Sequence, residues 1–217
     1  MIMSKFRFLC FVIILASIYP LQAADNAWKP LYDGTLKNWS VPKYGGDGEV
    51  VAEKDKLTIN RGDSMTGVRY DKFVPKEDYE ISYEARRTEG SDFFAACTFP
   101  VGKAFCTLVN GGWGGAVTGL SSITGSDASG NETTVNYDYA DNIWYRFRIS
   151  VTKKKIQVWI AKQDKDEKWQ EKPVIDLETE DREFSVRFEM NDYKPLGFCS
   201  WSSTGELRNI QYRVTGK

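Results

Sequence analysis

Alternation of apolar and polar residues with a period of two recurs along this chain, and few long windows carry a helical period. The clearest run covers residues 79–86, where the odd positions are Tyr, Ile, Tyr and Ala and the even positions are Glu, Ser, Glu and Arg. Successive side chains of a strand point to opposite faces of its sheet. We therefore expect the odd positions of this run to face a core and the even positions to face outward.

Similar short runs fill most of the remaining chain, separated by turn signals. They cover residues 49–59 (two strands around a turn at 53–56), 93–99, 104–109, 144–152, 156–160, 174–177, 196–201 and 207–214. Many short strands predict an all-β sandwich of two antiparallel sheets. No Pro/Gly-rich linker and no internal repeat divides the chain, so we expect one domain over residues 24–217.

The first residues have the pattern of a signal peptide. Lys5 and Arg7 precede an apolar run of 11 residues, 8–18, which is too short to span a bilayer. Pro20 ends the run, and cleavage is expected after Ala23, so that residues 1–23 are removed. The alternative is an uncleaved anchor. Export predicts a secreted or periplasmic protein that is not held in the membrane after cleavage.

Charge and composition exclude several kinds of site. The formal net charge is -1, which gives no basis for nucleic-acid binding. The chain contains 0 histidines, so it has no Ser-His-Asp triad, no Cys-His dyad and no His-ligated metal. An acid or base must then be Asp, Glu, Lys, Tyr or Cys. We expect no metal site and no cofactor, although the oxygen-rich loop described below leaves a structural calcium ion open.

Three cysteines remain after the expected cleavage: Cys97, Cys106 and Cys199. A four-residue hairpin loop over residues 100–103 would place Cys97 opposite Cys106, close enough to form a disulfide. Export permits such a bond. The alternative is three buried, reduced thiols, since cysteine is among the most buried residue types.

The segment 110–136 is rich in Gly, Ser and Thr and is expected to be a long functional loop. Its glycines allow the backbone to approach a ligand closely, and Trp113 among them offers a flat ring for the apolar face of a sugar. We expect Trp201 to line the same cleft; for both tryptophans the alternative is packing on the core. The polar residues expected to contact the sugar are Asn110, Asp127 and Asn131.

Two carboxylates are candidates for acid-base chemistry. Glu84 has Arg86 two residues away on the same face of its strand, about 7 Å along the chain, and we expect Arg86 to keep Glu84 ionised. Glu132 lies in the Gly-rich segment. Cleavage of a glycosidic bond needs two carboxyl groups about 5–10 Å apart. The alternative for each acid is a solvated face or a structural ion pair.

Segments spread over the whole expected domain resemble the 3-keto-disaccharide hydrolase domain family. They are 31–39 (LYDGTLKNW), 78–86 (DYEISYEAR), 144–149 (WYRFRI), 156–160 (IQVWI), 194–197 (KPLG) and 207–210 (LRNI). Two segments depart from the better-known branch of that family. Residues 105–108 (FCTL) lack its acidic residue, and residues 200–203 (SWSS) replace its Q-D-H-G. The motifs at 111–115 (GGWGG) and 127–133 (DASGNET) resemble instead a separate branch.

The resemblance implies a concanavalin-A-like jelly roll and an exported protein that acts on carbohydrate. Three functions follow as hypotheses: a glycoside-cleaving enzyme that uses Glu84 or Glu132 with Arg86, a non-catalytic carbohydrate-binding module, and an adhesion domain of the laminin-G kind. Fold kinship alone does not choose between them. The sequence predicts neither the sugar nor the oligomeric state.

Overall fold

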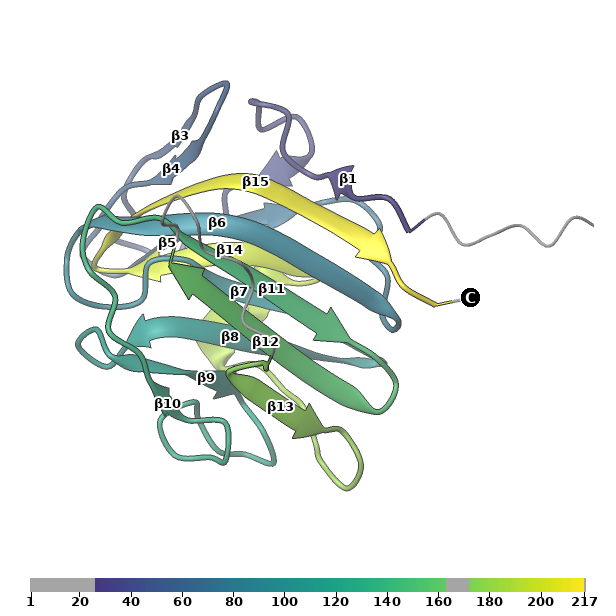
Figure 1. Ribbon diagram of the computed structural model, residues 1–217. Coiled ribbons are helices and arrows are strands. Elements are labelled where there is room, and N and C mark those ends of the chain that lie inside the picture. The colour runs from purple at the N-terminus through teal and green to yellow at the C-terminus, as the bar shows by residue number, and fades with distance from the viewer. Residues whose placement is uncertain (1–25, 163–171, 217) are drawn as a thin grey trace, which may run out of the picture.

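Two antiparallel β-sheets lie face to face in the computed structural model, which describes residues 26–162 and 172–216 (Figure 1). The expected signal peptide lies outside the described residues. The sequence-based prediction of an all-β sandwich is confirmed. We call the sheet at the front of Figure 1 sheet A and the other sheet B.

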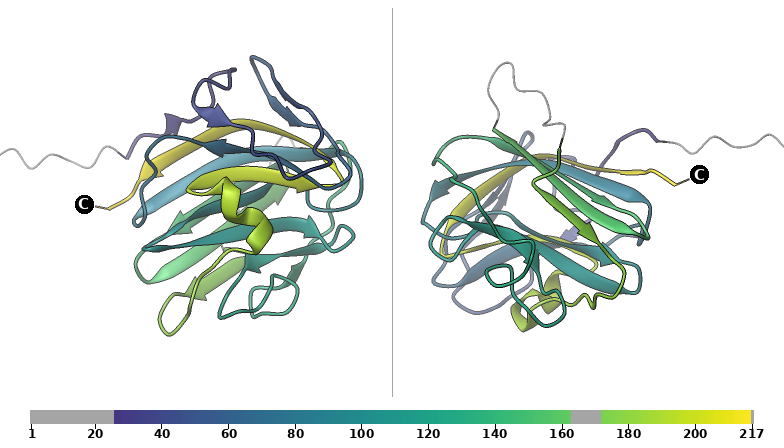
Figure 2. Two further views of the ribbon diagram at one scale, coloured as in Figure 1. Left: turned by 180° about the vertical axis from the view of Figure 1, so that it is seen from behind. Right: turned by 60° about the horizontal axis from the view of Figure 1, so that its bottom comes forward.

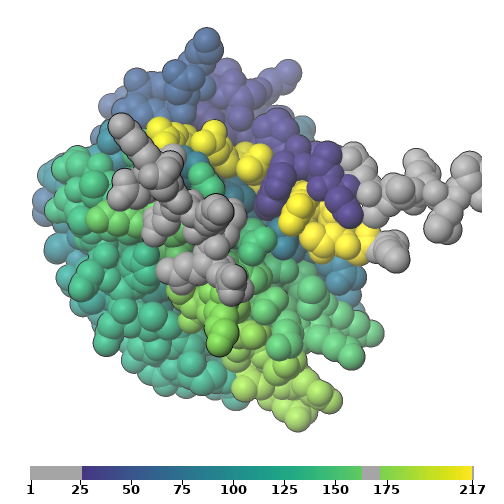
Figure 3. Space-filling view, in the orientation of Figure 1, coloured from purple at the N-terminus to yellow at the C-terminus, as the bar shows by residue number. Residues whose placement is uncertain are grey.

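Sheet A runs in the order β13-β12-β11-β6-β15-β4-β3, with β1 pairing to β15. Its strands are β1 (Lys29–Pro30), β3 (Val50–Ala52), β4 (Leu57–Ile59), β6 (Tyr79–Glu89), β11 (Tyr145–Val151), β12 (Lys155–Lys162), β13 (Ile175–Glu178) and β15 (Thr204–Val214). In the space-filling view, β1 (purple) lies against the C-terminal part of β15 (yellow) (Figure 3).

Sheet B runs in the order β10-β9-β8-β7-β14-β5-β2. Its strands are β2 (Trp39–Ser40), β5 (Met65–Tyr70), β7 (Ala96–Val101), β8 (Ala104–Gly112), β9 (Val117–Ser121), β10 (Val135–Asn136) and β14 (Leu196–Trp201). A 3-10 helix, η1 (Phe188–Tyr193), crosses the outer face of this sheet (Figure 2, left). No helix in the described part of the chain has the length and apolar character needed to cross a membrane.

The core lies between the sheets, and the alternation of strand β6 places its residues as predicted. Tyr79, Ile81 and Tyr83 are fully buried. The Tyr83 ring stacks on Phe147 of the same sheet at 4.9 Å between centroids and meets the edge of Phe198 from sheet B, also at 4.9 Å. Such ring pairs contribute about 0.5–1.5 kcal/mol each beyond the burial of their surface. Aromatic contacts therefore join the two sheets at their centre.

One position of strand β15 must be glycine, because another segment of the chain passes very close to it. A Cβ atom on Gly205 would lie 1.7 Å from the carbonyl oxygen of Phe94, which no side chain tolerates. Only glycine permits this contact between β15 and the segment before β7. The same segment carries residues of the site described below.

The β7–β8 hairpin has a two-residue turn at Gly102-Lys103, where Gly102 takes a φ of +58°. The expected four-residue loop is wrong, because glycine provides the positive φ that a tight hairpin turn needs. In the observed register Cys97 pairs with Leu108, and Cys106 pairs with Phe99. Cys97, Cys106 and Cys199, which we call the core cysteines, are buried and free, so the disulfide alternative is also wrong.

The expected long loop over residues 110–136 is wrong in part. Strand β8 continues to Gly112, strand β9 returns beside it, and β10 pairs with β9. A register shift between Asn110 and Gly112 lets the ladder continue through the glycines, with Gly111 at a φ of +78°. The irregular parts are a turn at residues 113–116 and a loop from 122 to 134.

Candidate aromatic cleft on sheet B

A cleft of about 260 Å³ opens at one end of the outer face of sheet B. It lies where the start of β5 meets the end of β14, because Met65 and Trp201 are paired there. Its lining combines apolar, aromatic and charged side chains: Met65, Asp92, Phe93, Val109, Trp113, Arg187, Glu189, Met190 and Trp201. We call it the aromatic cleft.

Trp113 stands at the tip of the β8–β9 turn, with 47% of its surface exposed. Its φ of +51° is left-handed, and Gly114 and Gly115 beside it also take positive φ values. The Asp92 carboxylate holds this turn, because its oxygens accept hydrogen bonds from the backbone N–H groups of Gly114 at 3.3 Å and Phe93 at 2.8 Å. A large apolar ring held exposed by a constrained backbone is typical of a binding site.

Trp201 is the last residue of strand β14 and lines the aromatic cleft, although it lies far along the chain from Trp113. Its backbone N–H donates to the Phe93 carbonyl at 2.9 Å, and the next residue, Ser202, takes a φ of +43°. The Tyr44 ring meets the Trp201 ring edge-on at 6.1 Å between centroids. The structure thus brings together the two tryptophans that the sequence suggested for one cleft.

Helix η1 and the residue before it supply the cleft with an ion pair. The Arg187 guanidinium lies between two carboxylates, 2.7 Å from Asp127 and 3.1 Å from Glu189. The hydrogen bond from Arg187 lowers the pKa of Glu189, and the same bond raises the pKa of Arg187. Glu189 is therefore ionised at neutral pH and serves as a hydrogen-bond acceptor. Met190 and Tyr193 anchor η1 in a small apolar cluster against sheet B.

Of the polar residues expected in the site, Asp127 reaches the cleft through Arg187, whereas the two asparagines do not line it. Asn131 donates to the carbonyls of Leu120 and Asp127, both at 2.8 Å, and accepts from Thr133. These bonds use its amide to hold the loop together. Asn110 is fully buried, with its side-chain oxygen accepting from the Ala95 N–H.

Glu84 and Glu132 do not form the expected pair of carboxylates. Glu84 lies on the outer face of sheet A, whereas Glu132 lies in the loop after β9 of sheet B, in an exposed ion pair with Arg182 at 2.8 Å. Backbone hydrogen bonding within Glu132 lowers its pKa, with help from Arg182.

The expected pairing of Arg86 with Glu84 is wrong. The antiparallel register places Arg208 and Arg146 directly beside Glu84, and these two arginines approach it to 2.8 and 3.6 Å. Directly opposed side chains lie closer than positions i and i+2 of one strand. Arg86 instead pairs with Glu206.

Sequence reasoning missed Asp92, Arg187 and Glu189. They lie outside the regular strands, in segments that show no period, and only the folded chain brings them beside the two tryptophans. Among the residues that the structure describes, no three His, Cys, Asp or Glu side chains gather in a group that could hold a metal ion.

Comparison with protein families gives one match, which spans nearly all of the described chain. The model of the 3-keto-alpha-glucoside-1,2-lyase-like domain matches residues 27–213. No curated protein matches the sequence.

Solved structures share the fold at low sequence identity. A carbohydrate-binding module, CBM66 from Bacillus subtilis, is 11% identical, with a TM-score of 0.52 over 81% of this chain and 95% of that chain. The Crh5 transglycosylase in complex with NAG is 11% identical, with a TM-score of 0.56 over 88% and 84%. The VIP36 exoplasmic/lumenal domain bound to Ca²⁺ and Man3GlcNAc is 9% identical, with a TM-score of 0.56 over 86% and 88%. The fold is therefore the concanavalin-A-like jelly roll that the family resemblance implied.

Proposed function

The chain belongs to the family of 3-keto-alpha-glucoside-1,2-lyase-like domains, and we propose that it is an exported protein that binds carbohydrate in the aromatic cleft. The observation that carries this proposal is the meeting of Trp113 and Trp201 in one cleft with the charged pair Arg187 and Glu189. The two tryptophans come from distant parts of the sequence, from the β8–β9 turn and from the end of β14.

The chemistry of the cleft suits a sugar. The C–H face of a pyranose ring can cover an indole, and its hydroxyl groups can donate to carboxylates and accept from a guanidinium. Ordinary small-molecule pockets measure about 300–1,000 Å³. A cleft of about 260 Å³ is slightly smaller than that range, which favours one or two sugar rings over a long chain. The solved structures of CBM66, a carbohydrate-binding module, of Crh5 with NAG and of VIP36 with Man3GlcNAc support a carbohydrate ligand for this fold.

Bond cleavage is the second candidate function, favoured by the carboxylates of Asp92 and Glu189 in the same cleft. In a 1,2-elimination from a 3-keto-glucoside, a base removes the C2 proton beside the 3-keto group. A double bond forms between C1 and C2, the C1–O bond breaks, and a proton passes to the departing alcohol. Both carboxylates are already engaged, Glu189 by Arg187 and Asp92 by the backbone N–H groups of Phe93 and Gly114, and for this reason binding is the first candidate.

A hydrolytic reaction at Glu84 and Glu132 is not supported, since these residues lie on different sheets. The two departures from the better-known branch of the family also argue against a hydrolytic reaction. Cys106 faces the core, and the segment 200–203 gives the cleft an indole where that branch has Q-D-H-G.

The test is a calorimetric titration of the protein, with residues 1–23 removed, against 3-keto-glucosides and plain glucan oligosaccharides. A turnover assay runs on the same samples. Saturable binding without product supports the binding function, and product that disappears in Glu189→Gln supports cleavage. An absence of binding to every glycan, together with capture of a protein partner, would contradict both and favour adhesion.

A further inference from the structure

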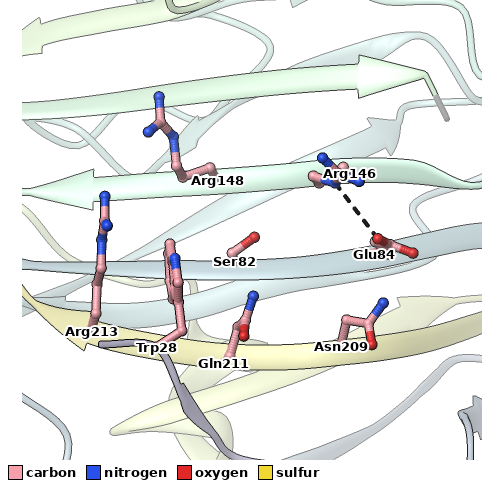
Figure 4. Close-up of a pocket in the computed structure, with 8 residues that line it drawn as sticks. All are labelled: Trp28, Ser82, Glu84, Arg146, Arg148, Asn209, Gln211 and Arg213. Atoms are coloured by element: carbon pink, nitrogen blue, oxygen red, sulfur yellow. Dashed lines mark ion pairs between the residues drawn. The ribbon is translucent and has the colours of Figure 1, made fainter. Parts of the chain in front are cut away.

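Exposed aromatic rings gather on the side of the molecule formed by sheet B. On the outer face of sheet A, arginines lie over the indoles, as Figure 4 shows for Arg213, whose guanidinium carbon lies 4.7 Å from the centre of the Trp28 ring. Beside the aromatic cleft, by contrast, Trp113 is 47% exposed and Tyr44 is 39% exposed. Tyr44 is an exposed ring that the cleft described above does not include.

Tyr44 lies next to the aromatic cleft, on the other side of Trp201 from Trp113. The Tyr44 and Trp201 rings are 6.1 Å apart between centroids. Strand β14, which ends at Trp201, lies between β7 and β5. Asp92, just before β7, holds the Trp113 turn, whereas the loop of Tyr44 packs on residues 60–64, just before β5. The three rings therefore form a row across this end of sheet B, with Trp201 in the middle.

The loop that carries Tyr44 is built in the same way as the Trp113 turn, from a carboxylate and glycines. The Asp47 carboxylate accepts hydrogen bonds from the backbone N–H groups of Tyr44 at 2.8 Å and Gly45 at 3.1 Å. Gly45 and Gly46 take φ values of +102° and +73°, and the two glycines after Trp113 are also left-handed. A ring on a loop that is already ordered costs less conformational entropy when it binds a ligand.

One serine ties the Tyr44 loop to the end of β14. The Ser64 hydroxyl donates a hydrogen bond to the Gly45 carbonyl, and the Ser64 carbonyl accepts one from the Ser202 N–H at 3.0 Å. Ser202 directly follows Trp201 in the chain. These two bonds therefore set the position of Tyr44 relative to Trp201 before any ligand is present, which is the arrangement that favours tight binding.

The angle between the two rings restricts the shape of a ligand that contacts both. The planes of Tyr44 and Trp201 are inclined at 67°. A single pyranose ring cannot lie flat on both of them, because stacking requires nearly parallel faces. Two linked sugar rings can, since rotation about the glycosidic bond turns one ring relative to the next. A ligand that uses the whole row of rings therefore contains at least two sugars.

We propose that Tyr44 forms a second sugar subsite beside the aromatic cleft, so that the ligand is an oligosaccharide of two or more rings. One sugar lies in the cleft between Trp113 and Trp201, and the next lies on Tyr44, outside the cleft volume of about 260 Å³. This proposal rests on the carbohydrate-binding function proposed above and adds the size class of the ligand to it.

The experiment is a calorimetric titration with single sugars and with their matched disaccharides. Methyl α-glucoside is compared with maltose, and methyl β-glucoside with cellobiose. We expect the disaccharide of the series that binds to have at least about tenfold higher affinity than its methyl glucoside, since it gains one more aromatic contact. Equal affinity for one ring and two would overturn the subsite and leave the proposed function standing. No binding by any of the four would overturn the proposed function, and the subsite with it.

Tyr44→Ala tests the residue itself. It should reduce disaccharide affinity to within about twofold of that for the methyl glucoside and leave methyl glucoside affinity close to that of the parent. Tyr44→Phe keeps the ring and should keep the gain. Tyr44 does not belong to the hydrophobic core, so we expect little change in the melting temperature of either variant. Phe73→Ala, which removes a ring that is 80% exposed, is the matched control and should leave both affinities within about twofold.

The methyl glucoside separates a subsite from a structural role. If Tyr44 only held Trp201 in place, Tyr44→Ala would weaken both ligands by the same factor, and that result would overturn the proposal. Disaccharide affinity that is unchanged in Tyr44→Ala would overturn it as well. Trp113→Ala should weaken both ligands, because its ring belongs to the aromatic cleft that every ligand enters.

Discussion

Replacing Trp113 with alanine is the most informative single change, because this ring is exposed and fixed by its backbone rather than by the core. With 47% of its surface exposed and a total of about 250 Å² for a tryptophan side chain, roughly 120 Å² is open to solvent. A sugar stacked on one face covers about half of that, or about 60 Å². At about 25 cal/mol per Å² this is worth about 1.5 kcal/mol.

The expected result is therefore a roughly tenfold increase in Kd for the glycan that binds the parent protein, since about 1.4 kcal/mol corresponds to a factor of ten. The assay is isothermal titration calorimetry at one salt concentration. The free energy of unfolding should change by less than about 0.5 kcal/mol, because a surface substitution away from the core removes little packing.

Phe73→Ala provides the matched control. Phe73 is 80% exposed and follows the far end of β5, opposite the end that opens into the aromatic cleft. It loses an exposed aromatic ring without touching the site, so its Kd should stay within about twofold of the parent. A Trp113→Ala variant that binds as tightly as the parent, or a Phe73→Ala variant that binds as weakly as Trp113→Ala, would refute the reasoning.

Three further predictions concern stability and reactivity. Burial would raise the pKa of Glu206, but its hydrogen bonds to Lys56 and Arg86 lower it below the usual value, so its stabilising effect is present above about pH 4.3 and is lost as the pH falls further. Thermal melts of Glu206→Gln should thus show a loss of about 1–3 kcal/mol at pH 7 that shrinks towards pH 3, and an equal loss at both pH values would contradict this. Burial raises the pKa of the core cysteines, that of Cys106 to about 12, so none of them should react with a thiol reagent at pH 7 until the protein is denatured; fast labelling of the native protein would show that the thiols are accessible. Gly205→Ala should fail to accumulate as folded protein, as judged by circular dichroism and proteolysis, because its methyl group would collide with the Phe94 carbonyl; a native-like melt would show that the two segments separate easily.

The fold could be predicted because its strands are local patterns. The alternation at residues 79–86 predicts which side chains of β6 face the core, without reference to its partner strands. The strand pair around residues 53–56 is also present as predicted. The registers of the strand pairs were harder to predict, since they depend on the lengths of the turns between the strands. One glycine, Gly102, tightened the β7–β8 turn by two residues and moved Cys97 away from Cys106.

The site could be predicted only in part, for a related reason. Trp113 was identifiable because a large ring among glycines has few local contacts to bury it. Arg86 was misassigned because the neighbour across a strand pair is closer than the neighbour along the strand, and the pairing of β6 with β11 and β15 is not a local property. Arg187 and Glu189 carried no periodic signal at all, and their role depends on where η1 packs on sheet B.

The central claim, that the aromatic cleft binds carbohydrate, is tested most directly by following the indole N–H signals of the seven tryptophans by NMR during a glycan titration. The account predicts that the signals of Trp113 and Trp201 move together with one Kd. The signal of Trp39, whose N–H is buried and donates to the Leu31 carbonyl, should stay in place. Saturable binding that leaves both Trp113 and Trp201 unmoved would contradict the claim.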